Sequence, residues 1–151
     1  MMSSEFERCI EKAKIVAFQK GPSLVSKELN SATEDLLSSK ESFDRGNYKW
    51  ATIQAYYSMF HTSRALIYNK KYREKSHYCL VIALEHLYLE KGLIEKGFIE
   101  SLTLGKDLRE SADYRSIFSK EGADNLIKMA DQFLTTAKKL LKKWPAFRKL
   151  T

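Results

Sequence analysis

Cysteine is scarce in this sequence, which contains only Cys9 and Cys79 among its 151 residues. The two lie far apart and in no CxxC arrangement, which predicts neither a disulfide framework nor a zinc motif. The beginning of the chain, "MMSSEFERCIEKAK", carries charges where the apolar part of a signal peptide would lie, so it predicts no export segment. Both observations favour a reducing cytoplasm as the location of the protein.

Long apolar segments are also missing. The longest stretch without a charge, 50–63, is shorter than the roughly 20 residues that a membrane-spanning helix needs, and Gln54 and His61 interrupt it. We therefore expect a buried helix of a soluble protein here, and no membrane partner.

Glycine and proline are few, with six glycines and two prolines. Most of them stand between segments in which apolar residues recur at helical spacing. The sequence therefore predicts an all-α protein, an up-and-down antiparallel bundle of about five to six helices without a sheet. The expected helices span residues up to 20, then 24–43, 48–68, 76–91 and 94–114, and a sixth from 121 until "WPAF". Gly21 and Pro22 are expected to end the first helix, and Asn47 and Ser76 to cap the third and fourth.

The predicted helix 48–68 is apolar around nearly its whole circumference, which is typical of a helix at the centre of a bundle. Tyr56, Tyr57 and Phe60 are therefore expected to be core residues, because a tyrosine can bury its ring while its hydroxyl finds a partner. His61 on the same helix is expected to be a hydrogen-bonded core or interface histidine.

Several motifs of common enzymes are absent. The sequence has no GxxxxGK[ST] or GxGxxG loop, no HExxH or GxSxG motif and no cluster of cysteine and histidine. His77 and His86 would point to opposite sides of one helix, so no metal site and no cofactor are expected. A glycine-serine turn followed by paired aspartates, which would hold magnesium in a nucleotidyl-transferring enzyme, is missing too. Any nucleotide transfer therefore belongs to another chain.

The net charge of +7 leaves two interpretations open. Lysine and arginine that neutralise phosphates gain free energy from counterion release, so nucleic acid or nucleotides are plausible partners. A generally basic surface that serves only solubility is the alternative. The length and an apolar content of 44% fit one globular domain over 1–151.

Two segments together resemble a known family. The chain has "ATIQAYYSMFHTSRALIYNKKYREKSH" and later "LRESADY", and this order of a tyrosine pair, MFH, KSH and ADY resembles the small HEPN-domain proteins of prokaryotes. The resemblance covers about 31–141 and leaves 1–21 as an N-terminal helical extension. It implies a helical bundle that dimerises and that is encoded beside a minimal nucleotidyltransferase as a toxin and antitoxin pair.

Members of this family bind nucleotides or RNA, or cut RNA without metal by an arginine that is followed, after four to six residues, by a histidine. Here only three residues separate Arg73 from His77, one fewer than the shortest spacing of that motif. The resemblance therefore implies a nucleotide- or RNA-binding partner of a separate nucleotidyltransferase. A metal-independent ribonuclease toxin using Arg73 and His77 is the first alternative, and a structural interaction module without a ligand is the second.

The resemblance and the charges single out a set of site residues. Arg64 needs a carboxylate or phosphate partner, for which Asp113 is a candidate, and Arg109 and Asp113 have the spacing of a helix-surface ion pair. Tyr72 and Tyr78 flank the basic loop and are candidates for modification by the transferase. The candidate binding residues are Lys70, Lys71, Arg73, Lys75, His77 and Arg109, and the supporting residues are Tyr57, Arg64, Asp113 and Tyr114.

Overall fold

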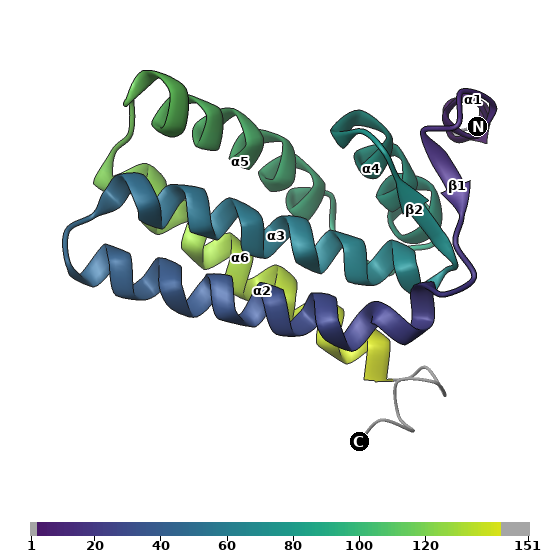
Figure 1. Cartoon of the computed structure of the whole chain (residues 1–151), viewed down its shortest axis with the longest axis horizontal. Coiled ribbons are helices and arrows are strands. Elements are labelled where there is room, and N and C mark those ends of the chain that lie inside the picture. Colours follow the sequence, from purple (N-terminus) through teal and green to yellow (C-terminus); the bar gives the residue numbers. More distant parts are fainter. Residues whose placement is uncertain (1–2, 143–151) are drawn as a thin grey trace.

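Four long helices form the body of the protein in a computed structural model that describes residues 3–142. They are α2 (Gly21–Asp44), α3 (Tyr48–Asn69), α5 (Lys96–Arg115) and α6 (Lys120–Lys142). Short connections make α2 and α3, and likewise α5 and α6, antiparallel neighbours, and the shorter elements gather at one end of the bundle (Figure 1). The prediction of an all-α bundle is confirmed, because helices dominate the described residues and α1 to α6 are six in number.

The central position of α3 is confirmed as well, since it packs against α2, α5 and α6. Asn47 caps it as predicted, with its side-chain oxygen accepting a hydrogen bond from the backbone N–H of Trp50. The helix is not buried on every side, however. Tyr56 is buried, but Tyr57 is 36% exposed and Trp50 is 45% exposed, so the expectation that Tyr57 is a core residue was wrong. Its ring lies at the edge of the α3–α5 contact, where water reaches it.

The first predicted helix is interrupted. Helix α1 (Ser3–Glu11) ends early, and Ala13 adopts a left-handed conformation with φ of 57°. Strand β1 (Ile15–Ala17) follows and pairs antiparallel with β2 (Tyr72–Glu74). The expectation of no sheet was therefore wrong. Ile15 favours a strand here, because it is β-branched and is buried in the core at 1% exposed.

Gly21 and Pro22 start α2 instead of ending the first helix. A proline in the first helical turn loses no hydrogen bond there and has a suitable φ angle. A side chain at position 21 would collide with the backbone carbonyl of Tyr68, so only glycine fits where α2 crosses the end of α3.

The fourth predicted helix consists of two parts. Helix α4 (His77–Leu84) continues into a π-helical turn, η1 (Glu85–Leu89). Ser76 caps α4 as predicted, because its hydroxyl accepts a hydrogen bond of 3.2 Å from the backbone N–H of Cys79. Arg73 therefore lies on β2, before the cap and outside the helix.

Gly105 allows α5 to approach α3 closely. Its Cα carries no side chain, and a Cβ there would lie 3.3 Å from both the Tyr56 ring and Leu126. The predicted stop of α6 at "WPAF" lies outside the described residues. No helix in the described part of the chain is long and apolar enough to cross a membrane.

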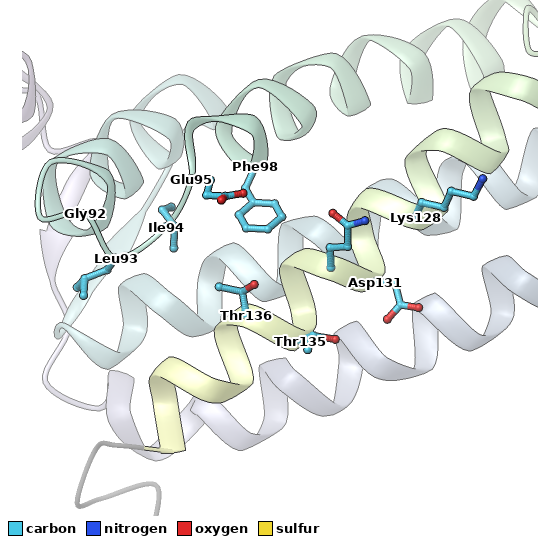
Figure 2. Close-up of a pocket in the computed structure, with 10 residues that line it drawn as sticks. Gly92, Leu93, Ile94, Glu95, Phe98, Lys128, Asp131, Thr135 and Thr136 are labelled. Carbon is cyan, nitrogen blue, oxygen red and sulfur yellow. The ribbon is translucent and has the colours of Figure 1, made fainter.

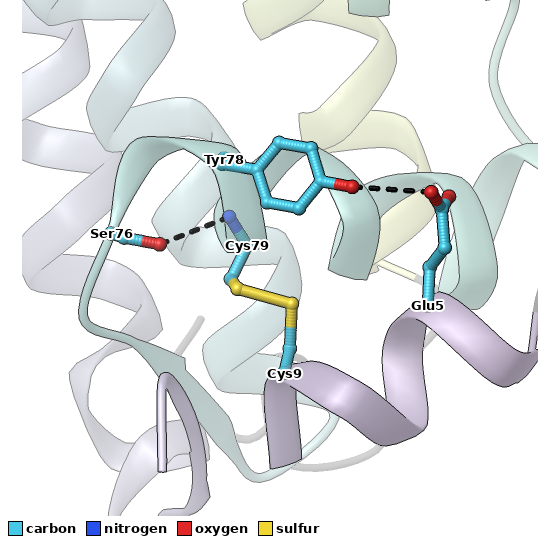
Figure 3. The surroundings of a disulfide bond; sticks show 5 residues. All are labelled: Glu5, Cys9, Ser76, Tyr78 and Cys79. Atoms are coloured by element: carbon cyan, nitrogen blue, oxygen red, sulfur yellow. Dashed lines mark hydrogen bonds between the residues drawn. A yellow bond between two sulfur atoms is a disulfide. The ribbon is translucent and has the colours of Figure 1, made fainter. Parts of the chain in front are cut away.

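Cys9 and Cys79 form a disulfide between α1 and the first turn of α4 (Figure 3). Their Cα atoms are 5.9 Å apart, although 70 positions separate them in the sequence. The sequence prediction of no disulfide was therefore wrong. The β1–β2 pairing explains the error, because it places α1 beside α4, which no local pattern of the two cysteines reveals.

Candidate functional site

An arginine surrounded by aromatic rings marks the contact between α3 and α5. The guanidinium carbon of Arg109 lies 5.8 Å from the ring centre of Tyr56, 5.5 Å from that of Tyr57 and 5.7 Å from that of Tyr114. Such cation–π contacts hold a guanidinium in place without neutralising its charge. Arginine stays protonated at any pH at which the protein folds, so the site carries a fixed positive charge.

Polar contacts orient the same guanidinium. Its Nη1 donates a hydrogen bond of 3.3 Å to the hydroxyl of Tyr114 and lies 3.7 Å from a carboxylate oxygen of Asp113. The predicted ion pair between Arg109 and Asp113 is therefore confirmed. The Nε atom of Arg109 is buried and has no hydrogen-bond partner among the described residues.

His77 joins this group through Tyr56. Its Nδ1 atom lies 3.2 Å from the Tyr56 hydroxyl, at the start of α4. Its Nε2 atom is buried and has no hydrogen-bond partner among residues 3–142. We refer to Tyr56, Tyr57, His77, Arg109, Asp113 and Tyr114 as the Arg109 cluster.

The histidine of the cluster is neutral at neutral pH. Burial lowers the pKa of the His77 imidazole below its usual value of 6.5, and the positive charge of Lys106 acts in the same direction. The carboxylates of Asp107 and Glu110 oppose this shift. A neutral imidazole has one nitrogen that donates and one that accepts, so Nε2 can take either role depending on the tautomer.

Tyr56 provides a neutral hydroxyl next to His77. Burial raises the pKa of Tyr56 to about 12, against a smaller lowering by Arg109, so the hydroxyl keeps its proton at neutral pH. If Tyr56 donates to Nδ1, His77 carries its proton on Nε2. If Tyr56 accepts from Nδ1, the Nε2 lone pair is available to accept a proton.

Sequence reasoning placed Tyr56 in the core and missed its contact with His77. The ring is indeed buried, at 4% exposed. One signal in the sequence could have indicated this contact. Phenylalanine would fill the same space in the core, so a tyrosine there indicates that its hydroxyl has a hydrogen-bond partner. Lys106, which also acts on His77, gave no comparable indication.

The basic loop residues lie elsewhere, on and around β2. The guanidinium of Arg73 lies over the ring of Phe18, at 5.2 Å, and among the described residues no hydrogen bond or ion pair joins it to His77. The Lys70 ammonium lies 5.5 Å from the Tyr88 ring centre, and burial lowers the pKa of this amine.

The two remaining lysines of the loop contribute backbone hydrogen bonds that extend the β1–β2 pairing. The carbonyl of Lys71 accepts from the N–H of Phe18 at 2.7 Å, and the N–H of Lys75 donates to the carbonyl of Lys14 at 2.8 Å. The structure thus brings His77 and Arg109 to Tyr56 and places Lys70, Lys71, Arg73 and Lys75 on and beside β2.

Arg64 has a different partner from the one expected. Its Nε atom donates a 3.0 Å hydrogen bond to a carboxylate oxygen of Glu74, and its predicted pairing with Asp113 was wrong. The reason is the unexpected strand β2, which places Glu74 over α3, while Asp113 pairs with Arg109 on its own helix. Burial raises the pKa of Glu74, and the charge of Arg64 opposes that shift.

His61 is hydrogen-bonded, as predicted. Its Nδ1 atom lies 2.8 Å from a carboxylate oxygen of Glu28, and its Nε2 atom lies 3.7 Å from one of Asp35. Among residues 3–142, no group of three or more histidine, cysteine or acidic side chains is arranged to hold a metal ion.

A separate pocket of about 620 Å³ lies between the loop before α5 and α6 (Figure 2). Ile94 and Phe98 line one side, and Asp131 and Thr135 of α6 line another. None of its lining residues belongs to the Arg109 cluster.

The fold and the cluster define a small helical-bundle protein with a fixed cation, a neutral histidine and aromatic rings on its α3–α5 face. A model of the HEPN domain matches residues 25–141, and the chain belongs to the HEPN-domain family. The match begins within α2 and leaves out α1 and β1.

Three archaeal proteins are similar to this chain in sequence. "Putative toxin MJ0605" of Methanocaldococcus jannaschii is 31% identical over 112 residues, which are 74% of this chain and 84% of that protein. "Putative toxin MJ0142" of the same organism is 25% identical over 119 residues, 78% of this chain and 81% of that protein. A "UPF0332 protein" of Archaeoglobus fulgidus is 31% identical over 107 residues, 69% of this chain and 84% of that protein.

Proposed function

We propose that this HEPN-domain protein is the nucleotide- or RNA-binding member of a toxin–antitoxin type pair. It acts as a homodimer, in the cytoplasm, beside a separately encoded nucleotidyltransferase. Two similar proteins are named as toxins, which supports the toxin-like role. The ligand and the partner rest on the resemblance and on the geometry of the Arg109 cluster.

The observation that carries this proposal is the combination of Arg109 with exposed aromatic rings. Tyr114 is 73% exposed and Tyr57 is 36% exposed, so both offer ring surface to a base. Stacking on an aromatic ring suits any base, and a guanidinium suits a phosphate. In the proposed complex, Arg109 contacts a phosphate, one of the two rings stacks on the base and His77 Nε2 hydrogen-bonds to the ribose or phosphate.

Binding of ATP and of a short single-stranded RNA, measured by fluorescence anisotropy of labelled ligands, tests this site. Arg109→Gln should weaken binding about 10- to 100-fold, since a hydrogen bond to a charged group contributes about 1.5–3 kcal/mol. Lys128→Gln is the matched control, because Lys128 is an exposed cation on α6 outside the cluster. Equal affinity of Arg109→Gln and wild type for both ligands would refute the proposed site.

A metal-independent ribonuclease is the second candidate, and the state of His77 favours it. A neutral imidazole with an unpartnered nitrogen can take the proton of a ribose 2′-hydroxyl, while an arginine stabilises the charge that develops on the phosphate. Both Arg73 and Arg109 are candidates for that arginine.

RNA cleavage in the presence of EDTA separates the two functions. If wild type cleaves the RNA and both His77→Ala and Arg73→Ala do not, the protein is a ribonuclease that uses Arg73 and His77, and the binding proposal is refuted. If cleavage is lost in His77→Ala and in Arg109→Ala while Arg73→Ala stays active, the catalytic arginine is Arg109 of the cluster. Intact RNA that stays bound to the wild-type protein would support the binding proposal.

The nucleotidyltransferase partner has its own test. Tyr78 is 60% exposed, and Tyr72 is only partly accessible, so we assign the proposed modification to Tyr78 in preference to Tyr72. Coexpression with a nucleotidyltransferase encoded beside this chain should add a nucleotide-sized mass increment to the wild type and none to Tyr78→Phe. An increment that persists in Tyr78→Phe and disappears in Tyr72→Phe would move the site to Tyr72.

A further inference from the structure

A small basic cleft leads to the disulfide between α1 and α4. It has a volume of about 280 Å³, and both Cys9 and Cys79 line it. The cysteines are only 3% and 5% exposed, so a reagent reaches the sulfur atoms through this cleft and not across an open surface. Tyr78 stands at its edge, with its hydroxyl bound to Glu5 at 3.1 Å (Figure 3).

The charge around the cleft is mainly positive. Arg8, Lys12 and Lys14 line it and are exposed, and within residues 3–142 none of them forms an ion pair. Glu5 is the one carboxylate among the lining residues, and it already accepts the hydrogen bond from Tyr78. Three cations around a narrow opening concentrate anions there and repel cations.

We propose that this cleft is a thiol–disulfide exchange site for an anionic low-molecular-weight thiol. A disulfide alone does not select a reductant, but a disulfide at the end of a positively charged cleft selects by charge. The proposal concerns α1 and α4 only, and it stands or falls independently of nucleotide or RNA binding at the Arg109 cluster.

The exchange proceeds in two balanced steps. The thiolate attacks the Cys9 sulfur, a bond forms between the two, and the Cys79 sulfur leaves with the electron pair of the broken disulfide bond. A second thiolate then attacks the sulfur of the bound thiol, releases Cys9 as a thiolate and leaves with the first as an oxidised pair. Two electrons pass from the two thiols to the protein.

The position of Cys79 decides which sulfur leaves. It lies in the first turn of α4, and its backbone N–H is held by the Ser76 cap. The positive end of a helix stabilises a thiolate, and a thiol of lower pKa leaves faster. The mixed disulfide therefore forms on Cys9, at the end of the short helix α1.

Reduction removes the disulfide that joins α1 to α4. The contacts that remain for α1 include those of the buried Phe6 ring, whose centre lies 4.3 Å from that of His86 and 5.5 Å from that of Tyr72, and the hydrogen bond between Glu5 and Tyr78. A helix of nine residues is too short to be stable alone. Hydrogen exchange in 3–11 should therefore be faster in the reduced protein.

Reduction rates of the oxidised full-length chain test the proposal. The thiols are mercaptoethanesulfonate, which is anionic, mercaptoethanol, which is neutral, and cysteamine, which is cationic, with each rate expressed per thiolate. At low salt the anionic thiol should react about tenfold faster than the cationic one, and the difference should shrink in high salt. Equal rates at low salt would overturn the proposal, as would full alkylation of both cysteines before any thiol is added.

Charge variants make the test specific. Lys12→Glu with Lys14→Glu should abolish or reverse the preference for the anionic thiol. Lys27→Glu with Lys139→Glu changes the net charge equally at exposed positions outside the cleft and should keep it. If both double variants change the preference among the thiols equally, the rates respond to net charge alone, and the proposal of an exchange site in this cleft is overturned. Peptide masses after acid quenching should place the trapped thiol on Cys9, and a thiol on Cys79 would refute the assigned leaving group.

Discussion

The ion pair between Arg64 and Glu74 should be a main attachment of β2 to the bundle. Its atoms are 3.0 Å apart, and the side chain of Glu74 is only 4% exposed, while that of Arg64 is 26% exposed. Removing one partner of a buried pair costs about 3–5 kcal/mol, because the other charge stays buried alone. Since water reaches part of Arg64, we expect the lower end, so that Arg64→Met lowers the free energy of unfolding by about 3 kcal/mol.

Urea unfolding of the oxidised protein measures this effect, with Glu74→Gln and the double variant completing a thermodynamic cycle. The double variant should recover most of the loss, because it leaves no uncompensated buried charge. We expect a coupling energy of about 2 kcal/mol. If the losses of the two single variants sum to within about 0.5 kcal/mol of the loss in the double variant, the reasoning is refuted.

The same pair predicts a pH dependence. Burial raises the pKa of Glu74 above its usual value of 4.5, so the folded state binds a proton more tightly than the unfolded chain does. The resulting stabilisation is fully present below the unfolded pKa and is lost as the pH rises through the folded pKa. Without Arg64 that pKa rises further, so Arg64→Met should be more destabilising at neutral pH than in acid. An equal loss at both pH values would contradict this prediction.

Three further predictions follow from the disulfide, His77 and the surface after α5. Cys9→Ser with Cys79→Ser should lower the free energy of unfolding by about 4 kcal/mol, because the bond closes a segment with a separation of 70 residues, and an unchanged urea midpoint against the oxidised wild type would contradict it. Since burial lowers the pKa of His77 below 6.5, its contribution to stability should fall as the pH falls below that value, and His77→Gln should flatten this part of the profile. Ile117 and Phe118 are 61% and 46% exposed, so Phe118→Asp should weaken the proposed homodimer in sedimentation velocity, and an unchanged association constant would exclude this face.

The helices of the body were predictable because local patterns determine them. Asn47 and Ser76 cap their helices with the side-chain contacts that their residue types predict. The predicted helix 48–68 ends within one residue of the observed end of α3. Each of these features depends on residues close together in sequence, where capping and spacing act.

The β1–β2 pairing and the disulfide were not predictable for the opposite reason. Each strand has three residues, too few for an alternating pattern, and each pairs with a partner more than 50 positions away. The same strand pairing accounts for the two errors at Arg64 and Cys79. Once 15–17 lies beside 72–74, Glu74 covers α3 and Cys9 reaches α4.

The candidate site was predictable in part. Arg109, Asp113 and Tyr114 came from the resemblance, and the structure places all three together. Tyr56 was assigned to the core on its ring alone, although its hydroxyl provides the link to His77. Residue type could indicate that a partner exists, but only the packing of α4 against α3 identifies it.

The first turn of α4 explains why His77 joins the Arg109 cluster while Arg73 does not. Ser76 must leave the helical conformation to cap α4, and the preceding residues continue as β2, so Arg73 turns to Phe18. His77 follows the cap directly and reaches the Tyr56 hydroxyl, whose ring also contacts Arg109. The cations on this side of the histidine lie on α5: Lys106, whose charge lowers the pKa of His77, and Arg109, which contacts the Tyr56 ring. Gly105 lets that helix approach Tyr56.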